Sequence, residues 1–242
     1  AIGNGAGQIS QQNAAVAIGT GAGKTSQGTL SVAIGQLTGY VGQNAQSVAI
    51  GFGAGQNAQG TSSVAIGNQT AVSKQDDYAI AIGKFAGYES QNAYCIALGQ
   101  SAGHSYQDDY AVAIGADAGK SIQGPRAVAI GKNAGEISQG GQCVAIGYYA
   151  GKTDQSTDAV AIGKEAGRTS QKAFSVAIGN ASGSNNQDVR SVAVGCYAAH
   201  TSQGAYAVAI GDQAGSTFQR QYSIAIGYNA GFSNQGDGAS GG

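Results

Sequence analysis

The chain has 242 residues, of which 42 are glycine and one is proline, and it contains neither tryptophan nor methionine. One glycine in about six residues is too few for the strict triplet of collagen, and a single proline excludes a polyproline rod. The charged fraction of 10%, the net charge of −1 and the hydrophobic fraction of 42% argue against a disordered chain and against a nucleic-acid partner. No apolar run is long enough to predict a membrane span within this chain, and we expect a mature product or a fragment because no leader precedes Ala1.

A repeat of 16 residues runs along the chain. The dipeptide Ala-Ile first occurs at Ala1-Ile2 and recurs every 16 residues as far as Ala225-Ile226, with Leu98 and Val194 as the only replacements of the isoleucine. The 15 copies contain no insertion or deletion. Because surface loops of globular proteins tolerate changes of length, a constant period indicates that each copy lies in register on the next.

Positions in each copy are counted here from the isoleucine, which is position 0. Position +1 is glycine in all 15 copies, position +5 is glycine in 13, and position +9 is glutamine in all 15. Position +10 is Gly, Asn or Asp in 11 copies, which predicts a turn with positive φ at that position.

Within one copy the predicted elements follow a fixed order. After Ile18 we expect a corner at Gly19, a weak strand over 23–27, a corner at Gly28 and a stronger strand over 30–34. Two strands and two corners in 16 residues predict one coil of an all-β, parallel β-solenoid, in which neighbouring coils lie about 4.8 Å apart. The sequence therefore predicts a single β-solenoid domain over 1–242, with about 15 coils and no separate caps.

The stronger strand alternates between Val or Ile on one face and Ala or Ser on the other, as in Ser47-Val48-Ala49-Ile50. The pattern leaves open which face is internal. Either Val and Ile fill the interior and a flat Ala/Ser face lies outside, or Ala and Ser fill the interior and a Val/Ile stripe lies outside. In both cases one Val and one Ile per coil are a small core for 16 ordered residues, so we expect lateral self-association.

The glutamine column has two interpretations. In the first, each side-chain amide bonds to the amide of the next coil and forms a structural ladder. In the second, the column is a polar track that binds a ligand. Because the glutamine occurs in every copy, we favour the ladder, which would contain Gln27, Gln43, Gln59, Gln75, Gln91, Gln107, Gln123, Gln139, Gln155, Gln171, Gln187 and Gln203, with Gln11, Gln219 and Gln235 at the ends.

The strand Ser-Val-Ala-Ile-Gly occurs at 31–35, 47–51, 63–67 and 175–179, with a small residue three positions after the last glycine. This pattern resembles the head repeat of the trimeric autotransporter adhesins, the YadA-like head. The resemblance implies a left-handed parallel β-roll, three chains packed side by side, and binding to host or matrix surfaces. It also implies an extracellular location or one on the surface of a cell or virion.

Two sets of corner residues are candidate sites. Tyr78, Tyr94 and Tyr110 occupy one position in three successive copies, and Tyr206 and Tyr222 occupy the same position in two later ones. We expect stacked aromatic ladders along an edge, and the alternative is a surface-binding track, for instance for a glycan or another host-surface ligand. Asn68 and Asn180 begin glycosylation sequons and are candidate glycosylation sites.

No catalytic, metal or cofactor site is predicted. His104 and His200 lie six coils apart and cannot share a metal ion or a catalytic dyad. The pairs Asp76-Asp77 and Asp108-Asp109 lie two coils apart, too far to converge on a calcium ion. The three cysteines are an odd number, which argues against an internal disulfide framework. We therefore do not expect an enzyme.

The sequence predicts a self-associating structural or adhesive rod that binds surfaces through its variable corner residues. Two alternatives remain open. One is a subunit that stacks end to end into a viral, phage or microbial filament, because uncapped coils expose strand edges. The other is an ice-binding protein that uses the flat face of a β-solenoid.

Overall fold

The computed structural model describes residues 1–233, so Gln235 lies outside the described residues. The chain divides into two compact units, Ala1–Arg126 and Ala127–Gly242. Both units are all-β, and the part of the second unit that is described ends at Ser233. None of the described residues forms a helix that could cross a membrane.

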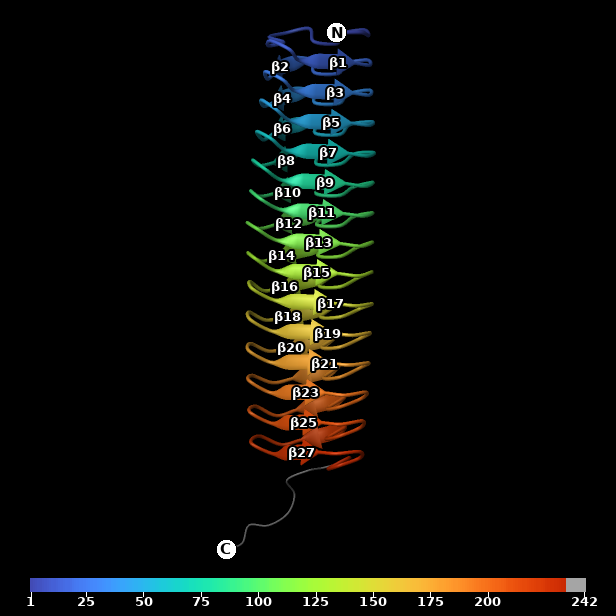
Figure 1. Ribbon diagram of the computed structural model, residues 1–242, viewed down its shortest axis with the longest axis vertical. Helices are drawn as coiled ribbons and strands as arrows, with labels where there is room; N and C mark the ends of the chain where they lie inside the picture. The colour runs from blue at the N-terminus through green and yellow to red at the C-terminus, as the bar shows by residue number, and fades with distance from the viewer. Residues whose placement is uncertain (234–242) are drawn as a thin grey trace, which may run out of the picture. The chain divides into compact units, whose positions relative to one another are not determined.

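Most copies contribute two short strands to their unit (Figure 1). In the first unit the stronger strands are β1 (Val16–Ile18), β3 (Val32–Ile34), β5 (Val48–Ile50), β7 (Val64–Ile66), β9 (Ile80–Ile82), β11 (Ile96–Leu98) and β13 (Val112–Ile114). The weaker strands are β2 (Thr25–Gln27), β4 (Val41–Gln43), β6 (Asn57–Gln59), β8 (Lys74–Gln75), β10 (Ser90–Gln91), β12 (Ser105–Gln107) and β14 (Ser121–Gln123).

The second unit repeats this order. Its stronger strands are β15 (Val128–Ile130), β17 (Val144–Ile146), β19 (Val160–Ile162), β21 (Val176–Ile178), β23 (Val192–Val194), β25 (Val208–Ile210) and β27 (Ile224–Ile226). Its weaker strands are β16 (Ile137–Gln139), β18 (Thr153–Gln155), β20 (Thr169–Gln171), β22 (Asn185–Gln187), β24 (Thr201–Gln203) and β26 (Thr217–Gln219).

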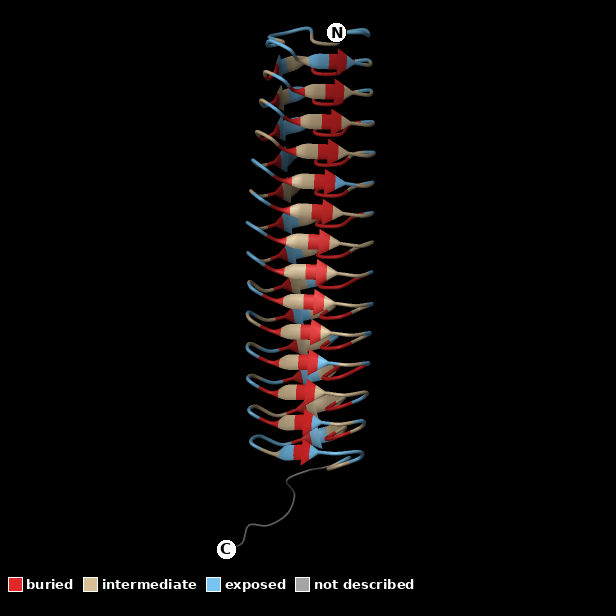
Figure 2. Ribbon diagram, in the orientation of Figure 1, coloured by how far each residue is buried: buried red, intermediate tan, exposed pale blue. Residues whose placement is uncertain are grey.

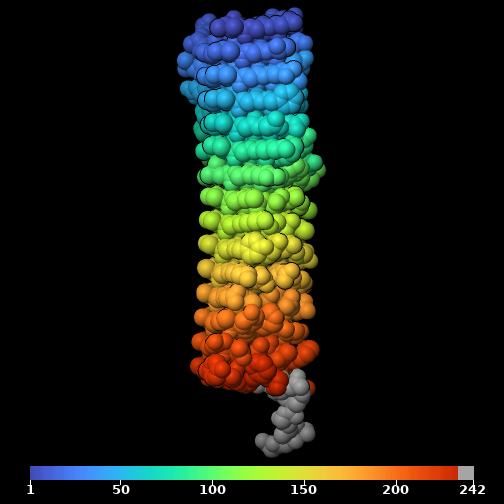
Figure 3. All heavy atoms as spheres, turned by 90° about the vertical axis from the view of Figure 1, so that its right-hand side faces the viewer, coloured from blue at the N-terminus to red at the C-terminus, as the bar shows by residue number. Residues whose placement is uncertain are grey.

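Strands of the same kind pair in parallel and in register, one repeat apart. In β1 and β3, for example, Val16 pairs with Val32 and Ala17 with Ala33. Each coil therefore forms a separate layer of side chains, as the space-filling view shows (Figure 3). The predicted parallel β-solenoid with a 16-residue repeat is confirmed. Over residues 1–233, however, 13 turns rather than 15 carry both strands, because the first copy forms only isolated bridges at Ile2 and Ile9 and the last described residue, Ser233, forms another.

The interior of each unit is filled by alanine, serine and glutamine. Ala33, Ala49 and Ala113, at the centres of their strands, are completely buried, whereas the flanking Val and Ile are half-buried or exposed. Figure 2 shows this as a buried centre in each stronger strand with less buried ends. The second of the two sequence alternatives is therefore the correct one. The ice-binding alternative needed Ala and Ser on a flat outer face, and these residues lie inside.

The weaker strand is shorter than predicted, since it covers +7 to +9 rather than +5 to +9. Except at Lys74 and Ser90, position +8 has positive φ among the described residues, for example 55° at Ser26 and 50° at Phe218, and this interrupts the alternation of a strand. As a result, the +7 and +8 side chains are both accessible, and only the +9 glutamine is fully buried.

Two types of glycine are required for different reasons. At +1, Gly99 has a φ of +128°, and a Cβ there would lie 2.8 Å from the backbone of Gly115 in the next coil. At +10, Gly28 does not have the predicted positive φ, and a Cβ there would lie 2.5 Å from the backbone nitrogen of Ala45. Positive φ occurs instead at +12, for instance 60° at Tyr78. The predicted turn conformation at +10 is therefore wrong.

Candidate functional site

The buried glutamines form side-chain ladders inside both units, as the repeat predicted. Gln107 donates from Nε2 to the carbonyl of Ile96 at 2.9 Å, to that of Ala111 at 3.1 Å and to Oε1 of Gln123 at 3.1 Å. Its Oε1 accepts a hydrogen bond of 3.1 Å from Gln91. The same side chain therefore links the two sheets of one coil and also links neighbouring coils.

The ladder is incomplete at the beginning of the first unit. Gln59 donates to Gln75 over 3.3 Å. Within residues 1–233, however, Oε1 of Gln27, Gln43 and Gln59 is buried without a partner. From Gln75 to Gln123, and from Gln139 to Gln219 in the second unit, consecutive amides are joined at 3.0–3.1 Å. Because the amides lie inside the coils, they are not a surface track for a ligand.

The +14 and 0 side chains of the stronger strands form an outward-facing stripe on each unit, which we call the outer stripe. Its members are Val or Ile at nearly every level, and Ile18, Ile82, Ile178 and Ile210 are among those that are exposed. An exposed apolar patch that is larger than those of typical monomers marks a surface for association with another molecule. The outer stripe is therefore the candidate site for contact between chains.

The predicted tyrosine ladders are present at position +12. The rings of Tyr78 and Tyr94 are 5.0 Å apart at 9°, and those of Tyr94 and Tyr110 are 4.9 Å apart at 1°. In the second unit, Tyr206 and Tyr222 stack at 5.2 Å. Stacked rings cover each other's faces, so the ladder presents ring edges to solvent and cannot offer the faces between the rings to a sugar.

The aspartates beside the first ladder support the neighbouring coils. Oδ1 of Asp77 accepts a hydrogen bond of 2.6 Å from the backbone NH of Thr61, and Oδ1 of Asp109 accepts one of 3.2 Å from Ala93. In both cases the partner lies one coil earlier in the chain. Among the described residues there is no group of three acidic, histidine or cysteine side chains that could hold a metal ion.

Each unit has a groove over the outside of its weaker strands, between the +8 and +10 side chains. In the first unit the groove has a volume of about 230 Å³, and its side walls include Tyr106, Ile122, Asn92 and Asp108. We call it the acidic groove, because its one charged wall residue is Asp108.

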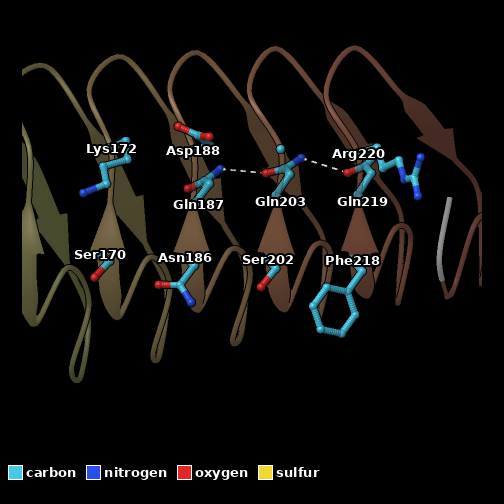
Figure 4. Close-up of a pocket in the computed structure, with 11 residues that line it drawn as sticks. Ser170, Lys172, Asn186, Gln187, Asp188, Ser202, Gln203, Phe218, Gln219 and Arg220 are labelled. Atoms are coloured by element: carbon cyan, nitrogen blue, oxygen red, sulfur yellow. Dashed lines mark hydrogen bonds between the residues drawn. The ribbon is translucent and has the colours of Figure 1, made fainter. Parts of the chain in front are cut away.

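The corresponding groove in the second unit has a volume of about 560 Å³. Figure 4 shows Ser170, Asn186, Ser202 and Phe218 in one row, the wall formed by position +8. Lys172, Asp188 and Arg220 form the opposite wall at position +10, and the glutamine ladder lies between the two rows. We call this the basic groove, because two of its three charged wall residues are cationic.

The basic groove was not predicted from the sequence. Alternation along the weaker strand directs the +8 side chains toward water, but it does not indicate that the positive φ at +8 and the inward +9 glutamine leave a hollow between +8 and +10. The sequence carries one signal of this groove, which appears when positions +8 and +10 are compared across successive copies. Lys172 and Arg220 at +10 flank a stretch that contains Phe218 at +8.

The histidines and cysteines lie apart from this groove. His104 stacks on Tyr88 at 5.0 Å, and burial lowers its pKa. The thiols of Cys95 and Cys143 donate to the carbonyls of Asp108 and Ser156, both at 2.8 Å. Burial raises the pKa of Cys95 to about 12 and that of Cys143 to about 11, so both thiols are protonated and inert at neutral pH.

The two sequons lie on the corners after the stronger strands. Asn68 and Asn180 are exposed, whereas their hydroxyl partners Thr70 and Ser182 are buried. The hydroxyl of Thr70 donates to the carbonyl of Gly83, and that of Ser182 donates to the carbonyl of Ala193 at 2.8 Å. In the folded chain these hydroxyls therefore have a structural role, and glycosylation of the two asparagines stays a prediction.

Comparison with known proteins gives one family. Two copies of the YadA head domain repeat match residues 58–86 and 202–230, one in each unit. No curated protein matches the chain. The matched segments share their 16-residue period, parallel pairing and buried glutamines with the copies around them. The chain is thus a parallel β-solenoid built of YadA-like head repeats.

Proposed function

We propose that this chain is the adhesive head of a surface fibre, in which copies associate side by side through the outer stripe and bind a surface through their remaining outer faces. The YadA head is a structural adhesin module, surface-exposed and trimeric in its family, and this supports a structural rather than an enzymatic function. Three copies and an extracellular or cell-surface location are what the proposal expects for this chain.

One observation carries the proposal. The largest apolar side chains of the repeat lie outside, while the interior holds alanine and glutamine. Alanine burial provides little hydrophobic free energy per coil, because that free energy scales with apolar area. Covering the outer stripe with other chains supplies the missing burial and leaves the opposite faces, with both grooves, accessible to solvent.

Light scattering on the purified chain tests the association. We expect a particle of three 23.8-kDa chains. Replacement of Val128, Val144 and Val160 by lysine places three charges in the outer stripe, and we expect loss of the trimer because buried, unpaired ammonium groups oppose association.

The matched control places three lysines at position +8, in the variant Ser138→Lys, Ser170→Lys, Ser202→Lys. Position +8 carries Tyr106, Asp154 and Asn186 in other copies at the same positive φ, so this variant adds the same charge at a site that tolerates varied side chains. It should remain trimeric. A folded wild-type monomer at micromolar concentration would exclude the proposal, and long particles that grow only by end-to-end stacking would favour the filament alternative.

A further inference from the structure

The basic groove combines three kinds of side chain on fixed backbone. Its charged wall carries Lys172, Asp188 and Arg220, its polar wall carries short hydroxyl and amide side chains, and Phe218 stands at one end with 56% of its surface exposed. Ligand sites typically join an apolar or aromatic surface to a few positioned polar groups. Position +8 is serine in several other copies, so the repeat itself does not require an exposed aromatic ring there.

Hydrogen bonds hold the backbone of the charged wall in place. The hydroxyls of Ser175, Ser191 and Ser223 donate to the carbonyls of Lys172, Asp188 and Arg220 at 2.5, 2.6 and 2.6 Å. The backbone NH groups of Lys172 and Asp188 also donate to glutamine carbonyls of the next coil, at 2.8 and 3.0 Å. The Cα positions of the charged residues are thus fixed at the coil spacing, which is the preorganisation that a binding site needs.

The spacing selects the type of ligand. Equivalent side chains along each wall are separated by one coil, about 4.8 Å, whereas side chains on one face of an extended peptide repeat at about 6.6 Å. A peptide laid along the groove would therefore lose register within a few residues. A linked pyranose ring advances by close to one coil, so successive sugars of a linear chain meet equivalent positions.

We propose that the basic groove binds a linear polysaccharide that carries carboxylates, such as one containing uronic acids. Lys172 and Arg220 pair with carboxylates of the ligand. Asp188 and the polar wall exchange hydrogen bonds with sugar hydroxyls, and the ring of Phe218 packs against the apolar face of a sugar. This inference names a ligand for the proposed adhesive head and rests on that function for its biological meaning.

The acidic groove of the first unit provides an internal comparison. It has the same position in the coil, but Asn92, Asp108 and Gly124 replace a cationic wall, and its volume is smaller. A carboxylated ligand would meet Asp108 there without a compensating cation. We therefore expect one binding site per chain, in the second unit.

Isothermal titration calorimetry with a galacturonic acid hexasaccharide tests the proposal. Lys172 and Arg220 lie three coils apart, so the probe carries a carboxylate on every sugar. The variant Lys172→Asn, Arg220→Asn uses a residue that Asn44 and Asn92 already provide at position +10, so it should fold. We expect it to bind about tenfold more weakly, which corresponds to the loss of two exposed ion pairs. The variant Phe218→Ser, which also uses a residue of other copies, should lose affinity several-fold at unchanged charge.

The control Lys132→Asn, Lys164→Asn removes two exposed lysines of the same unit at position +2 and should bind as the wild type does. A neutral hexamer of N-acetylglucosamine should bind much more weakly than the uronate. The proposal is overturned if the uronate does not bind, or if both double variants bind it equally. It is also overturned if poly-glutamate binds as tightly as the uronate with the same dependence on Lys172 and Arg220. The groove would then be a site for an acidic polypeptide.

These results are separable from the test of the adhesive head. All residues of the basic groove lie in one unit of one chain, so the titration gives an answer whether the protein is a monomer or a trimer. Light scattering reports association independently. A trimer that does not bind the uronate would disprove only the proposed ligand. A monomer that binds it would disprove only the proposed assembly.

Discussion

Replacing one glutamine of the ladder by methionine should cost different amounts at Gln107 and at Gln43. At most 1% of the surface of either residue is exposed. Gln107 takes part in four hydrogen bonds, two with carbonyls and two with neighbouring glutamines. Gln43 donates to the carbonyls of Val32 and Ser47 at 2.8 and 3.5 Å, and its Oε1 is buried without a partner among the described residues.

The magnitude follows from these contacts. Nε2 of Gln107 has two hydrogens for its three acceptors, so the side chain makes about three full hydrogen bonds. At about 1 kcal/mol each, Gln107→Met should destabilise its coil by about 3 kcal/mol. Gln43→Met loses two bonds but also removes an unpaired buried oxygen, which leaves a cost of about 1 kcal/mol. Because repeat proteins open locally, native-state hydrogen exchange of the surrounding amides measures each change directly. Equal costs at the two positions would show that hydrogen bonds between coils do not stabilise the solenoid.

Three further predictions concern single positions. Gly99→Ala should unfold its coil, since a Cβ there meets the backbone of the next coil. Gly42→Ala has its nearest atom 3.8 Å away and meets no clash, so it should lower the urea midpoint only by the cost of its φ of 68°, about 1 kcal/mol. Ile122→Asn should raise the free energy of unfolding by about 1 kcal/mol, because a β-branched residue is strained at a φ of 57° and Ile122 is exposed, and an unchanged midpoint would argue against strain. At pH 9, a thiol reagent should label Cys196 well before Cys95, whose raised pKa keeps it protonated until about pH 12, and equal labelling rates would contradict the buried position of Cys95.

The repeat alone was sufficient to predict the solenoid, its 16-residue coil and the glutamine ladder. Identical residues at a constant period can form columns only if the coils stack, and a buried amide in every copy needs a partner of its own kind. The conformation of individual corners was less accessible. Tyr78 and Phe218 have positive φ although their residue types disfavour it, because the coil closes only with that backbone and the neighbouring coils hold it in place.

The direction of the Val/Ile face also could not be predicted from the alternation. A period of two separates the faces of a strand but does not say which of them is internal. Here the inner space beside Ala113 is already occupied by the glutamine side chains, so only small residues fit. The groove depends on the same backbone detail, since the positive φ at +8 determines where Phe218 and Ser170 lie.

The central claim is that alanine lies inside the coils and the Val/Ile stripe outside. Circular dichroism spectra of Ala161→Leu and Ile162→Lys test it most directly, because these neighbouring residues belong to opposite faces of β19. Ala161 is completely buried, so we expect the larger leucine to weaken the β spectrum and lower its thermal midpoint through overpacking of its own and the neighbouring coils, while Ile162→Lys changes both less. A larger loss of β signal and of thermal midpoint in Ile162→Lys than in Ala161→Leu would place the core on the other face of the strand and contradict the account.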